Sequence, residues 1–107
     1  MSSLPKPPKQ YDAFVGQFPL LGAAWESINK AGSDGPLDDR TMRLVKLGVA
    51  MGAMREGSVH ASVRKALAIG ITPEEVHQVV ALAAGTLGMP SCVAVHSWAQ
   101  DIISKQT

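Results

Sequence analysis

The stretch of sequence that decides the fold is residues 54–90, MREGSVHASVRKALAIGITPEEVHQVVALAAGTLGMP. Apolar residues recur at helical spacing on both sides of Gly70, which interrupts the pattern. Just beyond this glycine, Thr72 precedes Pro73, and Glu75 lies three residues after the threonine. Threonine, proline and glutamate at these spacings are typical of a helix N-terminus that is closed by a capping box. The stretch therefore predicts two helices joined by a tight corner at Gly70.

Segments on either side of this stretch show the same helical spacing of apolar residues. They lie at about residues 11–18, 20–31, 39–51 and 91–103. Gly32 is expected to end the second of these, and Asp38 or Asp39 is expected to cap the start of the third. No stretch alternates between apolar and polar residues as a β-strand does. The sequence therefore predicts an all-α fold of about six helices.

Length and composition favour one domain that gains stability from self-association. The chain has 107 residues, of which 46% are apolar but only 5% are aromatic. Much of the apolar content is alanine and valine, and small side chains bury little area each. Burial between protomers is one way to compensate. We expect a flexible, proline-rich tail over residues 1–8, a single helical domain over residues 9–107, and a homo-oligomer.

Charge and cysteine content exclude several classes of protein. The formal net charge is +1, and the lysines and arginines are scattered along the chain, so nucleic-acid binding is not expected. No apolar run reaches membrane-spanning length, and the N-terminus lacks the hydrophobic segment of a signal peptide. Cys92 is the only cysteine, which excludes an internal disulfide, a Cys-x-x-Cys redox pair and a multi-cysteine zinc site. By default we expect a cytoplasmic location.

The first candidate for chemistry is a polar stripe on the helix that precedes Gly70. Glu56, His60 and Arg64 recur every fourth residue and therefore share one helix face. The carboxylate of Glu56 can orient the imidazole of His60, and the pair can then carry a proton to or from a substrate. Arg64 can bind a substrate carboxylate. The same spacing also fits a surface Glu–His pair and an arginine that meets only solvent, and spacing alone does not separate these interpretations.

The second candidate pair is Cys92 and His96, which are again four residues apart. A neighbouring imidazolium can stabilise a thiolate and make it a nucleophile. The alternative is a small buried thiol on a mostly apolar helix. His77 is expected to be exposed without a partner. No His-x-x-x-His or His-Glu-x-x-His spacing is present, so no metal site is predicted.

The run ExxxHxxxRxALxxGxTxEE, from Glu56 to Glu75, resembles the carboxymuconolactone decarboxylase family of the alkyl hydroperoxidase D-like superfamily. A VxxxA pattern from Val79 and a GxP pattern from Gly88 fit the same family, and the similarity extends over about residues 39–99. The resemblance implies an all-helical, alkyl hydroperoxidase D-like fold whose protomers assemble into intertwined dimers, trimers or hexamers.

The resemblance also implies two activities. Decarboxylase-type members act on small carboxylated lactones by acid–base chemistry, whereas hydroperoxidase-type members reduce peroxides with a Cys-x-x-Cys pair, a glutamate and a histidine. Counted back from Gly70, the two cysteine positions hold Arg55 and Ser58, and the position of the usual histidine holds Ser62. Serine cannot form the reversible disulfide that the dithiol cycle needs. His60 lies two residues before the usual histidine, about 200° away around a helix.

We therefore predict an oligomeric, lyase-type protein that acts without a metal or an organic cofactor on a small lactone or keto acid, in a pocket bounded by the oligomer. Glu56 and His60 would form its acid–base pair, and Arg64 would bind the substrate. Two alternatives stay open. One is a peroxiredoxin-type oxidoreductase that uses Cys92 with His96 and forms a sulfenic acid that an external thiol resolves. The other is a non-catalytic oligomer with a binding or structural role.

Overall fold

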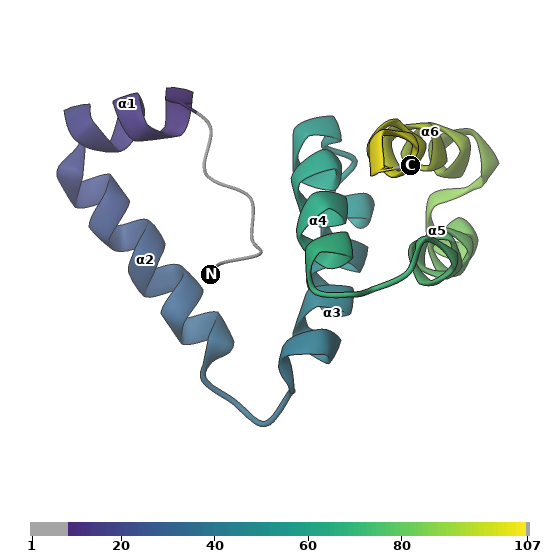
Figure 1. Cartoon of the computed structure of the whole chain (residues 1–107), viewed down its shortest axis with the longest axis horizontal. Coiled ribbons are helices and arrows are strands. Elements are labelled where there is room, and N and C mark those ends of the chain that lie inside the picture. Colours follow the sequence, from purple (N-terminus) through teal and green to yellow (C-terminus); the bar gives the residue numbers. More distant parts are fainter. Residues whose placement is uncertain (1–8, 107) are drawn as a thin grey trace. The chain divides into compact units, whose positions relative to one another are not determined.

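The computed structural model describes residues 9–106, and the tail expected over residues 1–8 lies outside them. This part of the chain is all-helical and contains no strand (Figure 1). Its helices are α1 (Lys9–Gln17), α2 (Pro19–Ser33), α3 (Asp39–Gly52), α4 (Glu56–Ala68), α5 (Pro73–Leu87), α6 (Met89–Ile103) and the short 3-10 helix η1 (Ser104–Gln106). No helix among these is long and apolar enough to cross a bilayer. The predicted all-α fold of about six helices is confirmed.

The helices fall into two compact units. One contains α1 and α2 and ends at Leu37, and the other contains α3 to η1 and begins at Asp38. Every residue predicted to take part in chemistry belongs to the second unit. These residues lie on α4 and α6.

The α1–α2 unit reverses direction at Phe18 and Pro19. Phe18 donates its N–H to the carbonyl of Phe14 at 2.8 Å, and the centroids of the two rings lie 5.1 Å apart. Gly22 permits the two helices to approach, because a Cβ at this position would lie 3.1 Å from Cβ of Val15. None of the side chains described in this unit is buried. The pair of helices therefore has no core of its own.

The prediction that α2 ends at Gly32 is wrong, because the helix continues through this glycine to Ser33. Oγ of Ser33 donates to the carbonyl of Lys30 at 3.1 Å, and the N–H of Asp34 donates to the carbonyl of Ala31 at 3.4 Å. These bonds satisfy carbonyls that the end of the helix leaves free. The helix therefore ends without a glycine in the left-handed conformation.

The predicted cap of α3 is confirmed at Asp38. Its Oδ1 accepts a hydrogen bond from the N–H of Thr41 at 2.7 Å. Hydrogen bonding to Thr41 holds the pKa of the Asp38 carboxyl below its usual value. The negative charge also lies at the positive end of the helix dipole. The hydrogen bond of Asp38 with Thr41 and the interaction of its charge with the helix dipole are thus sufficient to start α3 at this point.

The corner between α4 and α5 has the predicted form. Gly70 has a φ of 93°, a left-handed value that glycine adopts without steric cost. Its N–H donates to the carbonyl of Leu67 at 3.1 Å, and the N–H of Ile71 donates to the carbonyl of Ala66 at 3.0 Å. These two bonds form a Schellman motif, which closes α4. The same turn places the side chain of Ile71 in the core, where it is 2% exposed.

The capping box at the start of α5 is confirmed, and an ion pair ties it to α3. Oγ1 of Thr72 accepts from the N–H of Glu75 at 3.1 Å, and Oε1 of Glu75 accepts from the N–H of Thr72 at 2.9 Å. The other carboxylate oxygen of Glu75 pairs with the guanidinium of Arg40 on α3. The hydrogen bond from Arg40 and then that from the Thr72 backbone hold the pKa of Glu75 below its usual value.

We expect the substitution Glu75→Gln to destabilise the fold at neutral pH and to have little effect at low pH. Glutamine can keep the capping geometry but loses the charge that pairs with Arg40. Because folding lowers the pKa of Glu75, its contribution to stability is present above the unfolded-state pKa and is lost as the pH falls through the folded-state pKa. Thermal midpoints of the two proteins should therefore converge between about pH 7 and about pH 2.

The matched control for this comparison is Glu74→Gln. This substitution removes the same charge from the same helical turn, next to the capping residue. The interaction with the helix dipole is common to both variants, so the difference between them reports the contacts of the Glu75 carboxylate with Arg40 and Thr72. Equal thermal midpoints for the two variants at every pH would contradict a stabilising role for this ion pair.

The core of the second unit lies where α3, α4, α5 and α6 meet (Figure 1). Its buried apolar side chains are Leu47, Met51, Val59, Val63, Ala66, Ile71, Val76, Val80, Val95, Ala99, Ile102 and Ile103. Most of these are valine or alanine, so a few larger residues supply much of the buried apolar area. Leu47 and Met51 on α3 are the largest of the fully buried side chains.

Candidate functional site

His60 lies where α4 packs against α6, with its ring partly buried. Its side chain is 22% exposed, and its Nε2 lies 3.1 Å from Oδ2 of Asp101 on α6. Glu56, one turn before His60 on α4, places its Oε2 4.0 Å from the same nitrogen. This separation allows an ion pair but is too long for a hydrogen bond. The residue that holds the imidazole is therefore Asp101.

The contact with Asp101 selects one tautomer of His60. An ionised carboxylate only accepts hydrogen bonds, so Nε2 carries the proton that it donates to Asp101. In the neutral ring, Nδ1 is then the nitrogen with a free lone pair. The contact between the two helices thus leaves one basic nitrogen available, which is the property that a general base needs.

Asp101 is the residue of this cluster that sequence reasoning missed. It lies 41 residues after His60, and only the packing of α4 against α6 brings the two together. A weak signal was present, because Asp101 is the only acidic residue of α6. It also lies near the C-terminal end of that helix, where the dipole disfavours a negative charge. A carboxylate at such a position is more stable when a positively charged or hydrogen-bonding group from another element contacts it.

Arg64 lies one turn beyond His60 on α4 and is exposed. It belongs to a positively charged surface that also includes Arg43, Lys46 and Lys65. Partial burial, followed by the charges of Arg43, Lys46 and Arg64, holds the pKa of Lys65 below its ordinary value. A surface of one sign raises the local concentration of ions of the opposite sign. Arg64 therefore lies where an anion would be attracted.

Cys92 and His96 each contact a different partner. The thiol of the half-buried Cys92 donates to the carbonyl of Val80 on α5 at 3.4 Å. The ring of His96 lies against the ring of His77, with centroids 5.5 Å apart. His77 also forms a hydrogen bond through Nε2 with Oε1 of Gln100 at 2.8 Å, so the expectation that His77 has no partner is wrong. Over residues 9–106, no hydrogen bond joins the thiol to an imidazole.

The positions that hold redox residues in hydroperoxidase-type sequences lie at the start of α4 and one turn along it. Arg55 is the N-cap residue, and Ser58 is exposed in the first turn. Ser62, at the usual histidine position, is 7% exposed, and its Oγ is buried without a hydrogen-bond partner in the described part of the chain. The side of α4 that carries Ser62 thus faces the core, whereas His60 lies on a side that solvent can reach.

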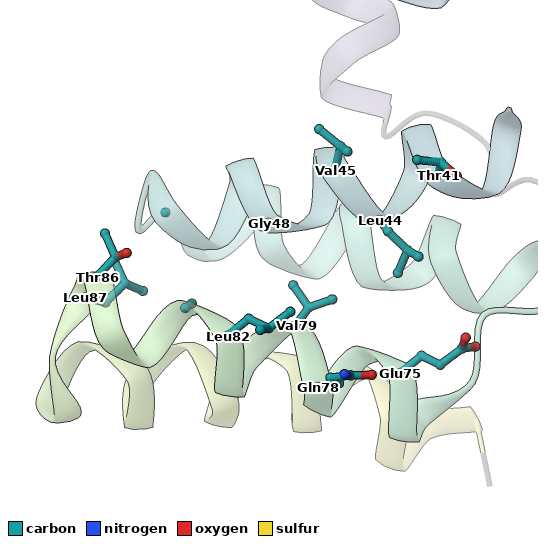
Figure 2. Close-up of a pocket in the computed structure, with 12 residues that line it drawn as sticks. Thr41, Leu44, Val45, Gly48, Glu75, Gln78, Val79, Leu82, Thr86 and Leu87 are labelled. Carbon is teal, nitrogen blue, oxygen red and sulfur yellow. The ribbon is translucent and has the colours of Figure 1, made fainter. Parts of the chain in front are cut away.

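An apolar groove of about 560 Å³ runs between α3 and α5 (Figure 2). Leu44 on α3 and Val79 on α5 point toward one another across it, and Glu75 lies at one end. The lining is completed by Thr41, Val45, Gly48, Gly52, Gln78, Leu82, Ala83, Thr86 and Leu87. None of the predicted site residues lines this groove. The groove and the cluster of Glu56, His60 and Asp101 are therefore separate features of the same unit.

Two glycines of α3, Gly48 and Gly52, line the groove. A Cβ added at Gly48 would lie 4.0 Å from Cγ1 of Val79, which is an ordinary contact. One added at Gly52 would meet no atom of the described residues within 4 Å. The packing of α3 against α5 thus requires neither glycine. Two large apolar side chains that line the groove, Val45 and Leu82, are 51% and 72% exposed.

The fold and the motifs together define the class of protein. An all-helical fold is what the sequence resemblance implied. The model of the Carboxymuconolactone decarboxylase family matches residues 19–101, which is most of the chain. The chain therefore belongs to the Carboxymuconolactone decarboxylase family, and its helical architecture fits the alkyl hydroperoxidase D-like fold. Searches of curated proteins and of solved structures gave no match.

Proposed function

We propose that the chain is a decarboxylase-type lyase that acts on a small lactone or keto acid by acid–base chemistry. The observation that carries this proposal is the contact of His60 with Asp101, which orients the imidazole and leaves Nδ1 free. Glu56 lies beside the same ring with 59% of its side chain exposed, so it can meet both substrate and solvent. Membership of the family supports this class of chemistry.

The proton that completes a decarboxylation would come from His60. The bond between the carboxylate and the adjacent carbon breaks, carbon dioxide leaves, and the electron pair stays on that carbon. Nδ1 of His60 must first take up a proton from water, which makes the ring an imidazolium. This proton then passes to the carbon and forms the new C–H bond, and water restores the proton to the ring. Asp101 keeps the ring in one orientation throughout, because Nε2 remains bonded to it.

Arg64 would bind a carboxylate of the substrate that is not lost in the reaction. A cation bound to the departing carboxylate would stabilise the ground state more than the transition state, in which that charge has moved to carbon. Four residues of helix rise about 6 Å, which is the scale of a small molecule with an acid group a few bonds from its reacting carbon. The proposal therefore favours substrates with a second acidic group over monocarboxylates.

The experiment that tests this function is the turnover of small carboxylated lactones and keto acids by the purified, metal-free chain. The wild-type protein should release carbon dioxide from at least one member of the panel, and His60→Ala should not. Circular dichroism would confirm that the variant is folded, since His60 is partly exposed and lies outside the buried core. Equal turnover by both proteins, or no turnover by the wild type, would contradict the proposed function.

We also propose that copies of the chain associate through their apolar surfaces. The groove between α3 and α5 exposes Val45 and Leu82, and α1 and α2 have no core of their own. Contiguous exposed apolar surface on a small domain favours association. The acid–base cluster lies outside the groove, so association does not require it to be covered there.

The substitution Leu82→Glu should shift the chain toward the monomer. A carboxylate placed in an apolar interface loses its hydration without gaining a partner, which costs several kcal/mol and weakens association by about 100-fold or more. Light scattering after size-exclusion chromatography would measure the molar mass of each protein. Val93→Glu on α6 is the matched control, because Val93 is also exposed, at 61%, but lies outside the groove. A monomeric wild type, or equal effects of both variants, would contradict this assembly surface.

A further inference from the structure

Three metal-ligating side chains meet where α4 packs against α6. One carboxylate oxygen each from Glu56 and Asp101 and one ring nitrogen of His60 lie within 4.8 Å of one another. In each ion pair the nitrogen involved is Nε2, at 3.1 Å from Asp101 and 4.0 Å from Glu56. We propose that these three residues form a binding site for a divalent transition-metal cation of the zinc class.

The geometry suits a tetrahedral ion with one open position. Ligand atoms about 2.0–2.2 Å from a tetrahedral zinc ion lie roughly 3.3–3.6 Å from one another. The two measured separations from Nε2 bracket this value. Both carboxylates are more than half exposed, so small side-chain rotations can close the site without moving either helix. Three protein ligands leave a fourth position, on the exposed side, for water or a ligand.

The donor set selects among cations. An imidazole nitrogen with two carboxylate oxygens suits zinc, copper and nickel, which bind nitrogen ligands more tightly than the alkaline-earth ions do. Magnesium prefers octahedral oxygen ligands and keeps several of its waters, so a site with one imidazole and two carboxylates is poor for it. Zinc is therefore expected to bind far more tightly than magnesium. The sequence lacked a recognisable metal motif because Asp101 joins the other two ligands only through tertiary packing.

A cation bound here would control the acid–base chemistry of the same cluster, a consequence that rests on the proposed function. The metal would occupy the lone pair of Nε2, so the proton of the neutral ring would move to Nδ1. The ring could then no longer carry a proton on both nitrogens, so it could not form the imidazolium that donates a proton in the proposed reaction, and Asp101 would bind the metal in place of the ring. Zinc is thus expected to inhibit turnover, and a chelator is expected to restore it.

The test is calorimetric titration of the untagged, chelator-treated full chain with zinc chloride and, separately, with magnesium chloride. Zinc should bind at one equivalent per protomer, and nitrogen NMR of the imidazoles should show the largest change at Nε2 of His60. Glu56→Gln and Asp101→Asn should each weaken zinc binding at least about tenfold, because loss of a direct ligand should cost no less than loss of an outer-shell partner. Both substitutions preserve side-chain shape, and both positions are exposed, so the fold should survive.

The matched control removes the other pair of imidazoles in this unit, His77 and His96, whose rings lie 5.5 Å apart. Replacing both with glutamine should leave zinc binding unchanged. Zinc binding that survives Asp101→Asn but is lost in this double variant would place the ion elsewhere and overturn the proposal. Absence of saturable zinc binding, or magnesium binding of equal strength, would also overturn it. These measurements use no substrate, so their outcome is independent of whether the metal-free chain shows the proposed lyase activity.

Discussion

Replacing Leu47 with alanine is expected to lower the free energy of unfolding by about 2–5 kcal/mol. Leu47 is fully buried on α3, and it is one of the few large side chains in a core made mostly of valine and alanine. The substitution removes apolar area and leaves a cavity that rigid helices fill only in part. A domain of this size is stable by about 5–15 kcal/mol, so the loss would be a large fraction of the total.

Urea unfolding followed by circular dichroism would measure this loss at a fixed protomer concentration, because association shifts the apparent stability. The matched control is Val49→Ala on the same helix, where 67% of the side chain is exposed. This change should alter the free energy of unfolding by no more than about 0.5 kcal/mol. Similar losses for the two variants would mean that α3 does not contribute Leu47 to a packed core.

The second large effect is expected at His60, where replacement by glutamine should lower kcat by about 10²–10⁴-fold. Glutamine can still form a hydrogen bond with Asp101, but it cannot carry a proton at neutral pH. Because Arg64 lies a turn away and is unchanged, the binding of the substrate carboxylate should survive. KM is therefore expected to change much less than kcat, which stopped-flow or steady-state kinetics with an active substrate would show.

Asp101 is expected to act as a positioning residue through the imidazole. Asp101→Asn should lower kcat less than His60→Gln does and leave KM nearly unchanged, because asparagine can bind the ring through its carbonyl but supplies no charge. Asp101→Glu, which restores the carboxylate, should recover part of the loss. A purely structural role would instead lower thermal stability in both variants without separating kcat from KM. Activity of Asp101→Asn equal to wild type would contradict the assigned role.

The parts of the fold that the sequence predicted are those decided by neighbouring residues. Asp38 and Thr72 cap their helices by bonding to groups three residues away, and Gly70 closes α4 through its own φ. Such bonds depend little on the rest of the chain, so their patterns can be interpreted locally. The prediction for the end of α2 was wrong because it considered only the glycine at that point. Ser33 and Asp34 form hydrogen bonds with the last carbonyls of the helix, so α2 can end beyond the glycine.

The candidate site was only partly predictable, because its contacts cross between helices. Helical periodicity placed Glu56 and His60 on one face, and the structure brings them to ion-pair distance. The shorter contact is with Asp101, which lies on another helix, so no regular spacing in the sequence indicates it. Cys92 and His96 had equally suitable spacing, yet the thiol turns to the carbonyl of Val80 on α5. A spacing of four residues thus permits a contact but does not decide whether another helix offers a better partner.

The groove between α3 and α5 shows a further limit of periodicity. The pattern predicted that both helices carry apolar faces. In the structure these faces leave an open groove, and residues such as Leu82 are exposed along it. An apolar face indicates that something covers it, but the covering partner depends on tertiary and quaternary packing.

The most direct test of the central claim is NMR of the metal-free protein in deuterium oxide with lactone and keto acids that carry two carboxylates. The wild-type chain should convert at least one of them to a product with deuterium at the carbon that lost carbon dioxide. His60→Gln should form this product at least about 100-fold more slowly. Equal rates for the two proteins, or no conversion of any such acid by the folded wild type, would contradict an acid–base role for His60.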